Sequence, residues 1–308
     1  MAINTLATAT LFQNTLDKVA IREAVTGWMD ANAGQVIYNG GAEVKIPKMR
    51  VQGLGDYDRD NGYQQGGVTL EYETRKMTQD RGRKFQLDPI DINENNFVTT
   101  AAAVMGEFQR AFVVPEIDAY RISKIATETI AAKKAGMVYY GYTRTSALRK
   151  LKEGIKAIRE LYNGPLVIHA TPDMIMELEF ELSGKIKNTT FSKGGINTAV
   201  PAVDDVPILS TPSNRMYTTI TLYDGKTEGQ KEGGYVKGTT AKDINFFICP
   251  RTTPIAVTKQ DIMRIFDPTI NQKLNAWQMD YRRFHDIWVL DNKLDSVYLN
   301  IKDAEPSA

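Results

Sequence analysis

The fold is decided by residues 91–134, which read DINENNFVTTAAAVMGEFQRAFVVPEIDAYRISKIATETIAAKK. Asp91 and Glu94 have the spacing of a capping box, in which the two side chains satisfy backbone N–H groups at the start of a helix. Behind them, apolar side chains recur every three or four residues and share one helix face: Phe97, Ala101, Val104, Met105, Phe108 and Phe112. The sequence therefore predicts a long amphipathic helix over residues 91–112.

Pro115 interrupts this pattern. A proline disfavours helical backbone in the residue before it, so the first helix is predicted to stop or kink at Val113 and Val114. A second helix can begin at Pro115 itself, because Glu116 and Asp118 would place negative charge at the positive end of that helix. We expect the two helices to form a spine, with the proline setting the angle between them.

Length and composition limit the class of protein. The 308 residues are enough for one large or two medium domains, and 42% hydrophobic residues supply a core. The net charge of +1 gives no overall attraction to nucleic acid or to acidic membranes. Cys249 is the only cysteine, which excludes an internal disulfide and is typical of a reducing compartment. Neither a membrane-spanning run nor a secretory signal is present, so we expect a cytosolic protein unless assembly carries it elsewhere.

The first part of the chain predicts an arm followed by a ribbon. Residues 1–33 have too few apolar side chains in their first half to build a core, so that segment is either an arm that lies on another surface or a frayed terminus. Residues 34–90 read as strands, with Pro47 indicating an edge or a bulge and strict alternation over 68–75. The strands flank the glycine-rich loop 53–67. Because an isolated two-stranded ribbon is at best marginally stable in water, we expect it to lean on a neighbouring surface.

Further helices are predicted after the spine. Residues 145–161 carry a single apolar stripe with charged residues elsewhere, which indicates an amphipathic helix. Thr171 caps a second helix that runs up to Gly184, and a short helix is expected over 260–266. Between them, residues 185–245 mix short strands with polar loops.

Two turns are predicted from composition. Asp80-Arg81-Gly82-Arg83 is rich in turn-forming residues and precedes a strand at 84–87. Asp291-Asn292-Lys293 has the composition of a hairpin turn between extended segments at 277–290 and 297–301.

No motif predicts a metal or cofactor site. Asp56, Asp58 and Asp60 alternate like the start of a calcium loop, but Asn61 and Gly67 stand where such a loop needs glycine and glutamate. The glycine groups lack the spacing of a phosphate-binding loop.

Arg81 and Arg83 beside Asp80 fit either an anion site or a set of ion pairs at a strand end, and we favour the ion pairs. His169, between Ile168 and Ala170, is best interpreted as a core histidine, and Cys249 as a small buried hydrophobe.

Residues 282–286 contain the densest ionisable group, formed by Arg282, Arg283, His285 and Asp286. Neighbours in a strand point to opposite faces, so His285 and Asp286 are not expected to share a site, and interface salt bridges are the favoured use. A cytosolic α+β hydrolase using His285 and Asp286 stays open as a remote alternative.

Four motifs, taken together and in order, resemble a known family. They are GLGDYDR at 53–59, DRGRKF at 80–85, EFQR at 107–110 with PEIDAYR at 115–121, and YRRFHD at 281–286. In this order and spacing they resemble major capsid proteins of tailed bacteriophages that infect low-GC Gram-positive hosts, which have the Hong Kong 97-type capsid fold.

The resemblance implies an α+β fold with four parts. These are an N-terminal arm (1–33), an extended β-hairpin loop (34–90), a peripheral domain with the spine helix (91–164 and 251–308) and an axial domain (165–250). Arm and ribbon fall where the residues alone predict them.

The resemblance also implies a structural subunit rather than an enzyme. Such a subunit assembles in the host bacterial cytoplasm with copies of itself, as pentamers and hexamers, into the icosahedral capsid of a virion that encloses double-stranded DNA without sequence-specific binding. Portal and scaffolding proteins are the implied partners, and no cofactor or membrane is implied. An encapsulin-like nanocompartment shell subunit is the alternative within the fold. We expect subunit contacts at Gly53, Gly55, Asp56, Asp58, Arg59, Asp60, Arg81, Arg83, Arg282 and Arg283.

Overall fold

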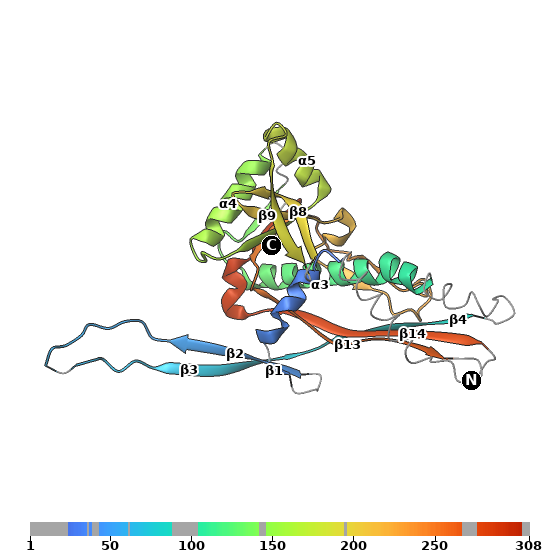
Figure 1. Ribbon diagram of the computed structural model, residues 1–308, viewed down its shortest axis with the longest axis horizontal. Helices are drawn as coiled ribbons and strands as arrows, with labels where there is room; N and C mark the ends of the chain where they lie inside the picture. Colours follow the sequence, from blue (N-terminus) through green and yellow to red (C-terminus); the bar gives the residue numbers. More distant parts are fainter. Residues whose placement is uncertain are drawn as a thin grey trace.

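The computed structural model describes residues 24–35, 37–38, 43–60, 62–87, 104–141, 146–193, 196–266 and 276–303. A long ribbon projects to one side of a roughly triangular body, and the spine helix crosses the body below a sheet with two helices and above a set of long strands (Figure 1). Two predicted segments, residues 1–23 of the arm and residues 91–103 of the first helix, lie outside the described residues.

The spine is one continuous helix through Pro115. Residues 104–108 are α-helical, Gln109–Val113 form a π-helical turn, and α3 covers Val114–Ala132. Val113 (φ −69°, ψ −49°) and Val114 (φ −63°, ψ −49°) are both helical. The Val114 N–H donates to the Gln109 carbonyl, five residues back, and this wider turn accommodates the proline ring and its missing N–H. The predicted break at Pro115 is therefore wrong.

The ribbon is a three-stranded sheet whose outer part has only two strands. Its strands are β1 (Ile37–Tyr38), β2 (Glu43–Val51) and β3 (Val68–Lys76), in the order β1-β2-β3. All pairings are antiparallel, and β1 reaches only as far as Lys45. Pro47 thus lies where β2 has no second neighbour, as its missing N–H requires. Figure 1 shows the outer ribbon extending well clear of the body.

A second three-stranded sheet, in the order β13-β14-β4, lies under the spine. Its strands are β4 (Gln79–Leu87), β13 (Pro254–Phe266) and β14 (Trp277–Val289). The turn predicted at residues 80–83 and the helix predicted at 260–266 are both wrong, since both segments pair with β14 along their length. Gly82 is needed for close backbone approach, because a Cβ there would lie 2.6 Å from the Tyr281 carbonyl oxygen.

The upper sheet has seven strands. In order across the sheet they are β5 (Val138–Tyr140), β15 (Tyr298–Ile301), β12 (Ile244–Pro250), β6 (Leu166–Ala170), β9 (Val206–Ser210), β8 (Ile196–Val203) and β7 (Lys187–Lys193). β5 and β15 come from outside residues 165–250, so this sheet joins the two domains that the resemblance implies. The domain boundaries themselves stay a prediction.

The central strand β12 is covered on both faces, so the core has two layers. Phe246 and Ile248 pack with the apolar stripe of α4 (Ala147–Arg159) and with α5 (Pro172–Glu181). Phe247 and Cys249 point the other way, into a cluster that includes Ile122 and Ile125 of the spine. The predicted helices at 145–161 and from Thr171 are confirmed, with the Thr171 hydroxyl accepting from the Met174 N–H.

Short elements complete the chain. They are η1 (Gly27–Gln35), η5 (Ser213–Arg215), the hairpin of β10 (Ile220–Leu222) and β11 (Tyr235–Lys237), and η6 (Asp291–Ser296). The hairpin turn predicted at residues 291–293 is wrong: η6 is a 3₁₀-helix, because β14 and β15 belong to different sheets and never pair. Among the described residues, no helix combines the length and apolarity needed to cross a membrane.

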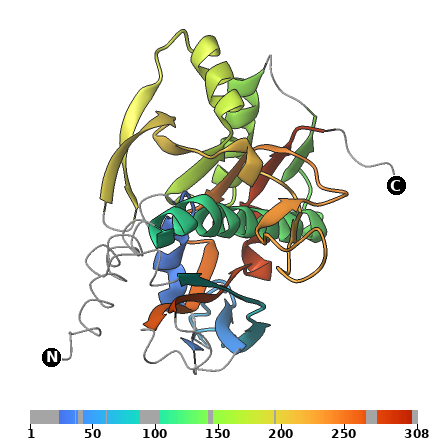
Figure 2. The same cartoon turned by 90° about the vertical axis from the view of Figure 1, so that its right-hand side faces the viewer.

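The segment before the ribbon is fastened to the spine. Trp28 and Met29 are buried in the core, and η1 lies beside α3 when the molecule is turned by 90° (Figure 2). Arg121, only 1% exposed, donates to the Thr26 carbonyl (3.0 Å) and to both carboxylate oxygens of Asp30 (2.6 and 3.1 Å). This contact holds the base of the ribbon in place.

Candidate functional site

The outer ribbon has one apolar face that nothing described covers. Directly opposed residues of antiparallel strands point to the same face, and three consecutive pairs on one face are apolar: Pro47 with Tyr72, Met49 with Leu70, and Val51 with Val68. Met49 is 62% exposed and Leu70 is 51% exposed. The opposite face of the same stretch carries Lys48, Arg50, Thr69 and Glu71. The alternation in the sequence predicted such a two-faced strand.

The inner ribbon uses its other face to hold the body. Val44 and Ile46 are buried against Trp288, Leu290, Ile255 and Val257. These two residues share a face with the charged Lys48 and Arg50, so the apolar side of the ribbon changes between Ile46 and Pro47. The outer apolar face therefore points away from the surface on which the inner ribbon rests, and none of the described residues covers it.

The predicted contact loop is a folded tip. The backbones of Asp58 and Gly62 pair (3.1 and 2.8 Å), and the Asp58 carboxylate accepts the Asp60 N–H (2.9 Å). Tyr57 and Tyr63 meet edge to face, with ring centroids 5.0 Å apart. The six residues predicted there as subunit contacts, Gly53, Gly55, Asp56, Asp58, Arg59 and Asp60, lie in this tip. Their role in subunit contacts stays a prediction.

The arginines predicted as contacts mostly bind carboxylates of their own chain. Arg81 makes a bidentate pair with Glu116 of the spine. Arg283, directly opposite Arg81 across the strands, pairs with Asp261 (2.6 Å). Two positive charges opposite each other on adjacent strands are destabilising unless each is neutralised. Glu116 neutralises Arg81, and Asp261 neutralises Arg283.

On the other face of the sheet, Arg282 pairs with Asp80 (2.5 Å). The ion-pair interpretation is therefore confirmed for Arg81, whose partner is Glu116. The pairs of Arg282 and Arg283 lie within the chain, so the use of these residues in interface salt bridges stays a prediction. Arg83 differs: its guanidinium donates to the Lys231 carbonyl (3.0 Å), and it has no carboxylate partner within the part of the chain that the structure describes. Whether any of the four arginines contacts another subunit stays a prediction.

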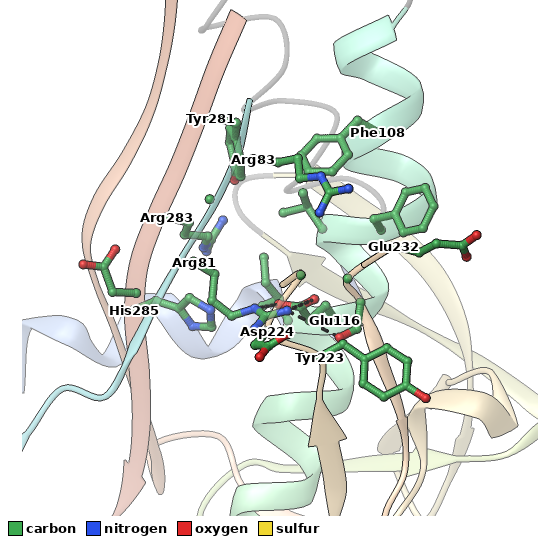
Figure 3. A pocket seen from close by; sticks show the side chains of 18 of the residues that line it. Arg81, Arg83, Phe108, Glu116, Tyr223, Asp224, Glu232, Tyr281, Arg283 and His285 are labelled. Atoms are coloured by element: carbon green, nitrogen blue, oxygen red, sulfur yellow. Dashed lines mark hydrogen bonds and ion pairs between the residues drawn. The ribbon is translucent and has the colours of Figure 1, made fainter. Parts of the chain in front are cut away.

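Arg83 lies at a cavity of about 290 Å³ (Figure 3). The walls are β4 and β14 on one side, the first turns of the spine on another, and the loop between β10 and β11 on a third. Arg81, Arg283 and His285 line it from the strands, and Phe108, Phe112 and Glu116 line it from the spine. No pattern in the sequence indicated this cavity, because its three walls are far apart along the chain.

His285 and Asp286 do different things, as the strand geometry predicted. Asp286 is fully buried and accepts from the Thr78 N–H (2.9 Å), the Thr78 hydroxyl (3.0 Å) and the Tyr120 hydroxyl (2.8 Å), and it pairs with Lys124. It thus fastens the junction between β3 and β4 to the spine. Burial, followed by the charge of Asp286, raises the pKa of Tyr120 well above its usual value, so this phenol stays a donor.

His285 is a buried neutral imidazole at the cavity. It meets the Tyr120 ring edge to face at 5.7 Å, and its Nδ1 has no hydrogen-bond partner among the described residues. Burial lowers the pKa of His285 well below its usual value, and nearby cations add to this effect: Arg283, Arg121, Lys124 and Arg81. The imidazole therefore resists protonation in the folded chain.

This depressed pKa predicts an acid-sensitive contribution to stability. Below about pH 6.5 the unfolded chain protonates this histidine and the folded chain does not, so the free energy of unfolding falls as the pH decreases. The variant His285→Gln should lack this pH-dependent part of the free energy of unfolding. Urea titrations between pH 7.5 and 5.5 should show that the wild type loses up to about 1.4 kcal/mol per pH unit more than the variant. Parallel losses in the two proteins would contradict the assignment.

A buried ion network at the spine escaped prediction. Asp118 accepts from the N–H groups of Val25 and Thr26 (2.9 Å each), from the Thr26 hydroxyl (2.5 Å) and from Arg215 (2.8 Å). From the sequence, Asp118 was predicted only to place negative charge at the start of a helix. Its neighbour one turn later, Arg121, is equally buried, and two opposite charges three residues apart on an apolar helix face are the signal that could have indicated a buried network.

Solved structures share this fold. The capsid of Ralstonia phage GP4 aligns at TM-score 0.53 with 11% identity, over 87% of this chain and 85% of that chain. The capsid of cyanophage P-SCSP1u aligns at TM-score 0.53 with 10% identity, over 86% and 84%. The mature capsid of bacteriophage PhiM1 aligns at TM-score 0.52 with 10% identity, over 88% and 85%. Neither a protein-family model nor a curated protein matches the sequence. The predicted α+β capsid fold of Hong Kong 97 type is confirmed.

Proposed function

We propose that this chain is the major structural subunit of a tailed-phage capsid, which assembles with copies of itself into a shell around double-stranded DNA. The observation that carries the proposal is the outer ribbon, whose exposed apolar face projects from the body and is covered by none of the described residues. Burying Met49, Leu70 and their neighbours would contribute roughly 1.5–3 kcal/mol for each large side chain. A surface of this kind, outside any cleft, is suited to binding protein.

The fold supports the same function. Phage capsid structures align over most of this chain and most of their own. A fold can host several functions, so the ribbon and the fold are needed together. Because each subunit would offer its ribbon to a neighbour and receive another, the contact is heterologous and closes into rings, which we take to be pentamers and hexamers.

The remaining parts of the proposal follow from this role. The subunit would be structural rather than catalytic, would assemble in the host cytoplasm with scaffolding and portal proteins, and would reside in the virion. The net charge of +1 suits a wall that encloses DNA without sequence-specific binding. A shell that encloses protein cargo instead of DNA would favour the nanocompartment alternative.

Deleting residues 53–67 tests the proposal. The tip packs on nothing else in the described chain, so the deleted chain should fold with unchanged circular dichroism and stay soluble. It should fail to close into shells, because the ribbon has lost the part that reaches furthest. Negative-stain imaging of both proteins at equal concentration measures this. Normal shells from the deleted chain would contradict the role of the ribbon.

A further inference from the structure

The cavity beside Arg83 plays no part in the proposed ribbon contact. It encloses about 290 Å³ between the strands β4 and β14, the start of the spine, and the loop that joins β10 to β11. Side chains from different walls turn toward the same space, as Figure 3 shows for Arg83, Phe108 and His285. This volume lies at the lower end of the range for ligand pockets, so the cavity suits a small molecule.

Arg83 is a cation that the fold holds in place without a counterion. Its guanidinium donates to the Lys231 carbonyl (3.0 Å), and no carboxylate among the described residues binds it. A Cβ on Gly225 would lie 3.1 Å from the Arg83 Nη1, and one on Gly233 would lie 3.6 Å from it, so these glycines leave the space that the guanidinium occupies. Because a guanidinium has five N–H donors, most of them remain available to a ligand.

The other charges around the cavity do not neutralise Arg83. Three of the four lining carboxylates are already bound: Glu116 by Arg81, Asp80 by Arg282, and Asp224 by the Thr227 hydroxyl and two N–H groups of its own loop. The fourth, Glu232, is exposed and points away from the other labelled side chains in Figure 3. Lys226 is an exposed lining cation with no carboxylate partner in the described parts of the chain. The charge that faces a ligand is therefore positive.

The β14 wall of the cavity contains buried polar atoms that lack hydrogen-bond partners. Arg283 and His285 are two residues apart in this strand, so their side chains share one face. His285 is only 5% exposed, and its Nδ1 has no partner among the described residues. The same holds for the Arg283 Nε, an N–H donor that the pair with Asp261 leaves unused. Such atoms are costly in a dry interior, so a polar occupant of the cavity would stabilise this wall.

We propose that this cavity binds the phosphate group of a small ligand through Arg83 and Lys226. The free groups are cations and N–H donors, which favour an oxyanion and disfavour a metal ion. A phosphate monoester carries a charge of about −1.5 to −2 at pH 7, which matches the two cations. The arginine fork also fits two phosphate oxygens at once.

An aromatic wall beside Arg83 can hold the rest of such a ligand. Phe112 is 49% exposed, and its ring stacks on Phe108 with the centroids 6.1 Å apart. It offers a flat apolar surface on which a second ring can stack. Inorganic phosphate and a monoester with a flat ring, such as a mononucleotide, share the phosphate chemistry, and they differ in their use of Phe112.

Isothermal titration calorimetry of the unassembled, full-length chain with deoxyadenosine monophosphate tests the site. Arg83→Gln keeps an amide donor but removes the charge, so it should weaken binding about tenfold or more. Arg149→Gln makes the same change at an exposed site on α4 and should leave the Kd unchanged. Both arginines are exposed, so the melting temperatures of the two variants should agree within about 2 °C.

Two further titrations identify the ligand. Deoxyadenosine has the ring without the phosphate and should bind about tenfold more weakly, or worse. Inorganic phosphate should displace the monophosphate: similar affinity identifies free phosphate as the ligand, and about tenfold weaker affinity identifies a monoester with a ring. The site is overturned by a lack of binding of both phosphates at millimolar concentration, by equal affinity for deoxyadenosine, or by an unchanged Kd in Arg83→Gln. Since the single subunit is titrated, these outcomes do not depend on the shell proposal.

Discussion

Replacing Leu70 by aspartate is expected to prevent shell assembly while leaving the subunit folded. Leu70 sits at the centre of the apolar ribbon face, opposite Met49, and is half exposed in the isolated chain. In an assembled shell this face would be covered, so the substitution loses the burial of a leucine and places an unpaired carboxylate in an apolar contact. A loss of about 2 kcal/mol per contact already raises the required protein concentration about thirtyfold.

Thr69→Asp is the matched control. It introduces the same carboxylate on the same strand, one residue away, on the charged face beside Lys48 and Arg50. The free energy of unfolding should change by no more than about 0.5 kcal/mol in either variant, because both sites are exposed. Light scattering and imaging should then show shells from Thr69→Asp only. Equal assembly by both variants would mean that the apolar face is not the contact.

Asp118→Ala is expected to cause the largest loss of stability of any single change considered. The carboxylate is fully buried and accepts from two backbone N–H groups, a hydroxyl and Arg215. Removing it leaves these donors without a partner and Arg215 without its counterion, at a cost of about 3–5 kcal/mol. The segment that precedes the ribbon would loosen from the spine, so assembly should weaken as well.

Urea unfolding measures this loss directly. Glu153→Ala is the control, since Glu153 forms ion pairs with Lys150 and Arg149 on the exposed side of α4. Such surface pairs contribute about 0–1 kcal/mol, so this variant should stay near wild type. If Asp118→Ala also unfolds at the wild-type urea concentration, the network does not fasten the segment.

The sequence predicts a helix or strand correctly where residues close together in the chain determine it. The helix over residues 147–159 and the two-faced strand at 68–76 follow from side chains a few positions apart, so periodicity predicts both. The sequence predicts a strand at 84–87 but a turn at 80–83, because the partner of the whole strand 79–87 lies about 200 residues later, and only that pairing explains Gly82. Long-range pairing overrides local propensity in the same way at residues 260–266.

The same distinction between local and long-range determinants applies to the candidate site. The tip and the ribbon were predicted because a glycine-rich loop between strands cannot bury itself. The cavity and the network around Asp118 were not, since each brings together side chains from three or more distant segments. Pro115 was identified from the sequence as a residue that disturbs the helix. The sequence did not predict the π-helical turn before it, which allows the helix to continue through the proline.

Electron microscopy of the purified, unmodified chain at increasing concentration tests the central claim most directly. Because none of the residues that the structure describes covers the apolar ribbon face, we expect capsomer rings and then closed shells of uniform diameter, with each ribbon lying across the adjacent subunit. A chain that stays monomeric at high concentration would contradict the account.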